Sequence, residues 1–307
     1  MEIASYTSRD CPICGTPPND LGPICYSSPP AESIKLEMLK EHWSGFFKDK
    51  VFFSYCRCHS CSALFCPKFF SNDQLAQLYS VMQHNMADLP VKSLERTQKG
   101  YFDVLKKFSP LKGDYLEVGP DQGFLAQACA ESGKFECLWL FEPNLMVHQE
   151  LERRVAGTPY RVFPALFDFS ILPKNQISVL CMVHVLDHLL DPRTVLENMK
   201  PILEQKAILL FVTHDEASWL SRWLGNKWPP YCLQHPQLFS PRTITGLFES
   251  VGYKVLCVKK SYNYYPIGYL LKHLLWTMGF RADWLPNLFS LPLRLGNIIT
   301  VVTLNKN

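Results

Sequence analysis

The chain has 307 residues, of which 47% are hydrophobic and 19% charged, and its formal net charge is +3. This composition provides enough apolar side chains for about two folded domains and excludes an intrinsically disordered protein. No run of Lys or Arg is longer than a pair, so the basic stripe that a long nucleic acid requires is missing and we expect no such partner.

The N-terminal segment carries no targeting signal that we can identify. The residues before the first cysteines include no apolar stretch, and no segment of the chain has the roughly 20 apolar residues that a transmembrane helix needs. We therefore expect no transmembrane segment and a cytoplasmic location. In that compartment the twelve cysteines are not expected to form a disulfide framework.

Two C-x-x-C pairs predict a zinc ribbon in residues 1–70. One pair is Cys11 and Cys14, and the other is Cys58 and Cys61. Each pair on a tight turn points two thiolates at one place, so two pairs complete a tetrahedral zinc site. All-cysteine sites are usually closed and structural, so we expect an architectural or partner-docking module. Other cysteines of this region stay open as alternative ligands: Cys25, Cys56 and Cys66.

A helical connector is predicted to follow the ribbon. Ser71 and Gln74 have the spacing of a capping box, which opens a first helix, and Leu94–Phe108 has the pattern of a second. After Gly113 short strands and helices alternate. We therefore divide the chain into a zinc-ribbon module (1–70), a connector (71–112) and an α/β domain (113–307).

The alternation in the third region predicts a Rossmann-like, doubly wound, mostly parallel sheet that binds ligands at the carboxyl ends of its strands. Residues 262–293 interrupt the last strand pair as a helical insertion with an apolar stripe. We interpret the stripe as core-facing; a lid over the acceptor site and a membrane-surface helix are the alternatives. The predicted strands are Tyr115–Val118, Cys137–Phe141, Tyr160–Phe163, Ile177–Val185, Lys206–Val212, Lys254–Lys259 and Ile298–Leu304.

The turn after the first strand indicates the class of cofactor. Its sequence, Leu116–Gly123 (LEVGPDQG), lacks the middle glycine of a dinucleotide fingerprint and carries Glu117 and Asp121. Two carboxylates repel an anionic pyrophosphate but suit a ligand that has an ammonium and a sulfonium group. Glu142, at the end of the second strand, is placed to accept both hydroxyls of a ribose.

With these motifs the chain resembles class I S-adenosylmethionine-dependent methyltransferases. Val183–His188 followed by Asp191-Pro192 is similar to the HVLEH…DP segment of that family. The cysteine pairs resemble the zinc-binding region that precedes such domains in bacterial sugar, glycan and natural-product methyltransferases. The resemblance implies that S-adenosylmethionine is the cofactor, and that it is bound by Glu117, Gly119, Asp121, Gly123, Glu142 and Asp168.

Methyl transfer is an in-line displacement at an activated sulfonium, so the protein supplies alignment and, for a hydroxyl or carbon acceptor, a base. Histidine suits this role at neutral pH. We expect His184, which follows the fourth strand, and His235, in a loop rich in Trp and Tyr, to be catalytic. For His188, which precedes a helix, we favour a structural role.

The predicted reaction is methyl transfer to a small molecule or glycan, which a carrier or lipid can bear, with O-methylation slightly favoured over C-methylation. Two alternatives stay open. Zinc ribbons also precede rRNA-modifying domains, which leaves an RNA methyltransferase. The family usually has glycine where Asp121 stands, which leaves a catalytically degenerate relative that binds a partner.

Overall fold

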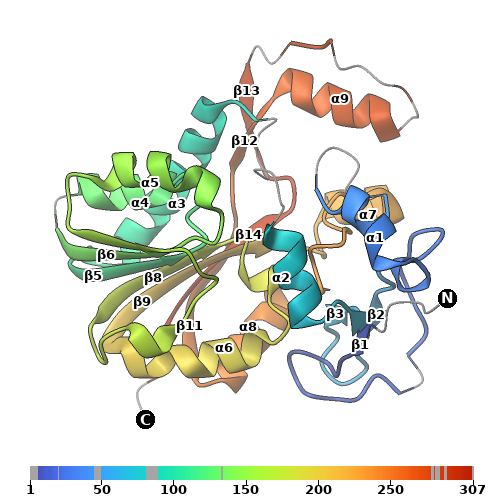
Figure 1. The fold of residues 1–307 in the computed structure, drawn as a ribbon, viewed down its shortest axis with the longest axis horizontal. Helices are drawn as coiled ribbons and strands as arrows, with labels where there is room; N and C mark the ends of the chain where they lie inside the picture. The colour runs from blue at the N-terminus through green and yellow to red at the C-terminus, as the bar shows by residue number, and fades with distance from the viewer. Residues whose placement is uncertain are drawn as a thin grey trace.

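The computed structural model describes residues 6–19, 21–44, 50–80, 89–132, 134–277, 280, 284–286 and 289–305. Within them a central sheet carries helices on both faces, as Figure 1 shows. An N-terminal module lies beside one end of this sheet, and an arm built around helix α9 projects from the α/β domain (Figure 1).

The central sheet has seven strands in the order β11-β14-β9-β8-β5-β6-β7. The five strands from β9 to β7 are parallel, and β14 is antiparallel to both of its neighbours. The predicted mostly parallel, doubly wound sheet is therefore confirmed, and all seven predicted strands are present. They are β5 (Gly113–Val118), β6 (Phe135–Phe141), β7 (Tyr160–Phe163), β8 (Ile177–Val183), β9 (Leu203–His214), β11 (Tyr253–Lys260) and β14 (Asn297–Leu304).

The order of the strands reverses between β5 and β8, which is the topological switch point where ligands bind in such sheets. Helices α3, α4 and α5 cover one face of the sheet, and α6 and α8 cover the other (Figure 1). Because both faces are covered, the central strands are apolar almost throughout. The helices are α3 (Val91–Phe108), α4 (Phe124–Glu131), α5 (His148–Val155), α6 (Pro192–Met199) and α8 (Pro241–Ser250).

Helices α6 and α8 begin at capping residues, Asp191 and Ser240. Asp191 accepts a hydrogen bond from Thr194 N at 3.0 Å, with Pro192 at the first helical position of α6. In the connector, Ser71 and Gln74 exchange the two bonds of the predicted capping box, at 2.8 and 3.3 Å. The capping box opens helix α2 (Asn72–Ser80).

The N-terminal module shares its core with the α/β domain. Strand β3 (Leu64–Phe65) pairs with β10 (Gln237–Leu238), a short strand that precedes α8. Trp228 is buried within the aromatic core of the module. The module and the α/β domain therefore pack directly against each other. The remaining elements of the module are β1 (Thr7–Ser8), α1 (Leu36–Leu39), β2 (Cys56–Arg57) and β4 (Lys68–Phe69).

The predicted insertion forms an arm of three elements: β12 (Asn263–Pro266), α9 (Ile267–Thr277) and β13 (Ser290–Leu293). The expectation that its apolar stripe faces a core is wrong, because Ile267, Leu271 and Leu274 are between 38% and 43% exposed. Helix α9 packs chiefly against β12 rather than on the sheet. Met278, the last residue of the predicted stripe, lies outside the described residues.

Among the described residues, no helix combines the length and the apolar character needed to cross a lipid bilayer.

Candidate active site

A cavity of about 1110 Å³ lies at the carboxyl ends of β5, β6 and β8. It begins at the glycine turn after β5, passes four histidines, and ends between α7 (Trp219–Leu224) and the arm. Small-molecule sites usually measure roughly 300–1,000 Å³. The cavity is thus large enough for a cofactor and a second ligand together.

The turn after β5 needs two of its glycines. Gly119 and Gly123 have φ angles of +70° and +80°, in the region that L side chains avoid. A Cβ on Gly119 would lie 2.7 Å from the Val185 side chain, and one on Gly123 would collide with Leu151. The turn thus lies close to the loop after β8 at Gly119 and to helix α5 at Gly123, and Gly119 lines the cavity.

Asp121 occupies the position where the family usually has glycine, with a φ of +51°. Aspartate tolerates this left-handed conformation better than most residues. Its backbone N–H donates to Glu142 Oε2 at 2.8 Å, and Asn144 N donates to Glu142 Oε1 at 2.8 Å. Both acidic residues line the cavity. Burial raises the pKa of the Asp121 carboxyl to about 6.

Glu117 lies behind the cavity wall. Its side chain is buried and accepts a hydrogen bond from Tyr115 OH at 2.7 Å. Burial raises the pKa of Glu117 to about 8, although the Tyr115 hydroxyl opposes this rise. Glu117 therefore lies behind the turn, where it can support it, and does not line the cavity.

Asp168 is turned toward its own loop. Its Oδ1 accepts from Ser170 N at 2.9 Å and caps a short 3₁₀ helix. The residues of this loop that line the cavity are Leu166 and Phe167. Of the six predicted cofactor residues, the structure thus brings Gly119, Asp121 and Glu142 to the cavity and leaves Gly123 and the side chains of Glu117 and Asp168 outside its lining.

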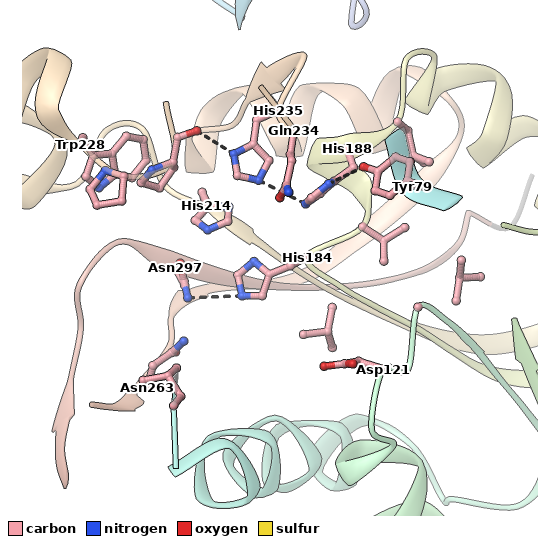
Figure 2. Close-up of a pocket in the computed structure, with 18 of the residues that line it drawn as sticks. Tyr79, Asp121, His184, His188, His214, Trp228, Gln234, His235, Asn263 and Asn297 are labelled. Carbon is pink, nitrogen blue, oxygen red and sulfur yellow. Dashed lines mark hydrogen bonds between the residues drawn. The ribbon is translucent and has the colours of Figure 1, made fainter. Parts of the chain in front are cut away.

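Four histidine rings follow one another along the cavity wall (Figure 2). The ring centroids of His184 and His214 are 4.6 Å apart, those of His214 and His235 4.7 Å, and those of His235 and His188 4.6 Å. Figure 2 shows Asp121 across the cavity from this row. Both predicted catalytic histidines, His184 and His235, are therefore at the cavity, 51 residues apart in the chain but separated by one ring.

His214 forms a pair with Asp187 that the sequence did not single out. Its Nδ1 lies 2.6 Å from Asp187 Oδ2, and its backbone N–H donates to the same oxygen at 3.2 Å. Asp187 is fully buried. Burial alone would raise the pKa of its carboxyl, but the charges of His214, His235 and His188 outweigh burial and hold that pKa well below its usual range.

A metal ion is a second way to use these side chains, because ligand atoms of His184, Asp187 and His214 lie within 4.8 Å of one another. Two ligands of one ion are separated by about 3 Å or more at metal–ligand distances near 2.1 Å. The 2.6 Å between His214 and Asp187 is shorter and is typical of a charge-assisted hydrogen bond. We therefore interpret the two residues as a hydrogen-bonded dyad.

His188 connects the cavity to the connector helix α2. Its Nδ1 lies 2.9 Å from Tyr79 OH, and its Nε2 lies 3.2 Å from His235 Nε2. His235 Nδ1 donates to Pro230 O at 2.7 Å. Burial lowers the pKa of His235, but Cys232, Asp187 and the Pro230 carbonyl together raise it to about 9. His188 is thus part of the polar wall, and does not merely begin the next helix as its sequence position suggested.

His184 has a strained backbone at the end of β8. Its φ is +53°, and its N–H donates to Val212 O at 2.8 Å, which fixes the chain there. Its Nε2 lies 3.4 Å from Asn297 Nδ2 on β14 (Figure 2). The ring therefore occupies a defined place between the glycine turn and His214.

The four cysteines of the two C-x-x-C pairs lie together. Cys11 Sγ is 3.5 Å from Cys61 Sγ, and Cys14 Sγ is 3.6 Å from Cys58 Sγ. Zinc–sulfur bonds of about 2.3 Å place tetrahedral sulfurs about 3.8 Å apart, so this donor set fits one zinc ion. The alternative ligands Cys56 and Cys66 instead approach backbone carbonyls, those of Leu21 and Phe53.

Comparison with known proteins agrees with the geometry. A family model described as a methyltransferase domain matches residues 93–258. This match spans more than half of the chain, so the chain belongs to that family. The protein is an S-adenosylmethionine-dependent methyltransferase.

Solved structures support the fold. The chain is similar to an S-adenosylmethionine-dependent methyltransferase of Leishmania major, with a TM-score of 0.51 and 12% identity over 94% of this chain and 99% of that one. It is also similar to a chain from a Haloferax volcanii complex that contains the Trm112 methyltransferase activator, with a TM-score of 0.50 and 13% identity over 70% and 93%. At such identities the likeness concerns the fold alone. No curated protein matches the sequence.

Proposed function

We propose that the protein transfers the methyl group of S-adenosylmethionine to a hydroxyl of a small-molecule or glycan acceptor, with His214 as the base. The Asp187–His214 pair carries this proposal, because its histidine lines the same cavity as the glycine turn. When bound, the cofactor supplies an activated methyl group. The protein then has to align the acceptor, exclude water and remove one proton.

His214 is better suited to the role of general base than His184 and His235, the two histidines predicted from the sequence. When Asp187 accepts the Nδ1 proton of His214, it fixes the tautomer in which Nε2 is a proton acceptor. The buried carboxylate also stabilises the imidazolium that forms after proton transfer. His235, with a pKa of about 9, is protonated at neutral pH and donates hydrogen bonds instead. We assign His184 to positioning, between the glycine turn and His214.

The cofactor end of the cavity has suitable partners for each part of S-adenosylmethionine. The Asp121 carboxylate would pair with the ammonium group, and Glu142, held by two backbone N–H groups, would accept the ribose hydroxyls. Leu166 and Phe167 offer apolar surface for the adenine. Glycine at the Gly119 position allows the backbone to approach the ligand closely.

A phosphate-rich acceptor such as RNA fits this cavity less well. Four acidic residues line it and would repel phosphates: Asp73, Asp121, Glu142 and Asp191. These charges favour a neutral acceptor over a nucleic acid.

The pairing of Asp121 with the ammonium group predicts a pH dependence. Below its pKa of about 6 the Asp121 carboxyl is protonated and must lose a proton before it can pair with the ligand. The affinity for S-adenosylhomocysteine is therefore expected to be about tenfold lower at pH 5 than at pH 7.5. Isothermal titration calorimetry at both pH values measures this change.

Asp121→Asn is the control, because the amide keeps the shape of the side chain but does not titrate. The variant is expected to bind S-adenosylhomocysteine more weakly at pH 7.5 and to lose most of the pH dependence; what remains reports Glu142. If Asp121→Asn keeps the pH profile of the native protein, Asp121 is not the group that pairs with the ammonium.

We also propose that Cys11, Cys14, Cys58 and Cys61 hold one structural zinc ion. The ion would tie the first turn of the module to the β2–β3 hairpin, whose strand β3 pairs with β10. Elemental analysis of protein purified without chelator is expected to give about one zinc per chain, and Cys14→Ser is expected to lower this content and the melting temperature. A native protein free of zinc would contradict the proposal.

A further inference from the structure

Beyond the histidines the lining of the cavity becomes apolar. We propose that this part binds a long apolar chain carried by the acceptor, whose hydroxyl end lies at His214; the proposal rests on the function proposed above. The lining residues come from helix α7 and from the arm, two segments distant in sequence. The apolar and aromatic residues that line this channel are Leu220, Trp223, Leu224, Tyr265, Tyr269, Leu270, Leu274, Leu293 and Leu295.

The charges of the lining favour a neutral chain at this end. Among the described residues, the four carboxylates that line the cavity come from α2, the glycine turn, the end of β6 and the start of α6, and none comes from α7 or from the described part of the arm. Lys227 and His273 are the cationic side-chain types of the channel lining, and His273 Nδ1 already lies 3.0 Å from Tyr269 O. A neutral chain therefore enters without leaving a buried carboxylate unpaired, and its burial is favourable.

The shape of the channel fits a chain that is longer than the cavity. The rings of Tyr265 and Tyr269 are stacked, with an interplanar angle of 15°, and both residues line the cavity. At the outer end Trp223 lines the channel and is 64% exposed, and Leu274 is 43% exposed. The apolar wall thus continues to the surface, as in a binding groove. A compact polar sugar would leave this surface uncovered.

Alkyl glucosides test the proposal, because they join a hydroxyl-bearing head to a chain of chosen length. Their affinity is measured by calorimetry below the critical micelle concentration, with S-adenosylhomocysteine present at saturation. The affinity is expected to rise by up to about fourfold per methylene, and to be at least tenfold higher for octyl than for methyl glucoside. Equal affinities for the two compounds would overturn the proposal.

Two neighbouring leucines of α9 provide a matched pair of variants. Leu270 lines the channel, whereas Leu271 is 42% exposed and does not line it. Leu270→Asp is expected to lower the affinity for octyl glucoside at least tenfold, whereas Leu271→Asp is expected to leave that affinity unchanged. Both variants are expected to keep the native affinity for S-adenosylhomocysteine. Equal effects of the two substitutions would refute the channel. Trp223→Ser, at the exposed end of α7, repeats the test if Leu270→Asp does not fold.

A dissolved amphiphile and a lipid in a bilayer both offer such a chain. Sedimentation with phosphatidylcholine vesicles, with and without dodecyl glucoside, separates the two sources. If the protein sediments only with vesicles that contain dodecyl glucoside, and Leu270→Asp does not, the acceptor is drawn from a membrane. If the native protein sediments with neither kind of vesicle, the acceptor is a dissolved amphiphile. Vesicle binding that survives Leu270→Asp and needs no glucoside overturns the proposal. All of these readouts are binding, so they remain valid even if His214 is not the base.

Discussion

Replacing His214 by Asn is expected to lower kcat for methyl transfer by about 10²–10⁴. The amide keeps a similar polar shape but cannot accept a proton at neutral pH. The wild-type rate should also fall on acidification, because a protonated imidazole is not a base. Transfer of labelled methyl from S-adenosylmethionine, with any acceptor that supports turnover, measures both effects.

Asp187→Asn is the companion variant, because it removes only the charge behind His214. We expect a large fall in kcat, since the neutral amide neither fixes the tautomer nor stabilises the imidazolium. His184→Asn is the matched control for another histidine of the same row, and a smaller effect is expected from it. If His184→Asn abolishes turnover and His214→Asn does not, the base is His184, as the sequence suggested.

Gly119→Val is expected to lower the affinity for S-adenosylhomocysteine by at least about a hundredfold. The residue has a φ of +70°, and a Cβ would lie 2.7 Å from the Val185 side chain. The turn must therefore move, and it carries the N–H that orients Glu142. Calorimetric titration measures the loss.

Gly157→Val is the control for this substitution. A Cβ at Gly157 meets no atom within 4 Å, and Gly157 does not line the cavity. Native affinity is expected for this variant. If Gly119→Val also keeps native affinity, the glycine turn is not the cofactor site and the placement of the cofactor is incorrect.

The sequence predicted the central sheet well, because its information is local. Alternating strands and helices, a glycine turn after β5 and Glu142 after β6 each depend on a few neighbouring residues. The cysteine cluster could be predicted equally well, because a C-x-x-C turn fixes where its two sulfurs point. In the structure these same four sulfurs lie together.

The dyad could not be predicted in the same way. Asp187 and His214 are 27 residues apart and meet because parallel strands β8 and β9 end at the same edge of the sheet. Topology places several histidines at that edge, but only the short helical turn after β8 decides which ring faces Asp187. The contact of His188 with Tyr79 spans 109 residues and leaves no periodic pattern in the sequence.

Two further features depended on tertiary packing. The pairing of β3 with β10 involves only two residues on each strand, too few to give a sequence signal, and it joins the N-terminal module to the α/β domain. The apolar stripe of α9 correctly indicated a helix. The spacing of the apolar residues does not determine what covers them. In the structure some residues of the stripe line the channel and others are exposed.

The central claim is that His214 acts on the acceptor and not on the fold or the cofactor. Parallel measurement of S-adenosylhomocysteine affinity and of turnover in His214→Asn tests it most directly. We predict a dissociation constant within about twofold of the native value, together with the loss of kcat. If the affinity and the melting temperature fall along with turnover, or if turnover persists at the native rate, His214 is not the catalytic base.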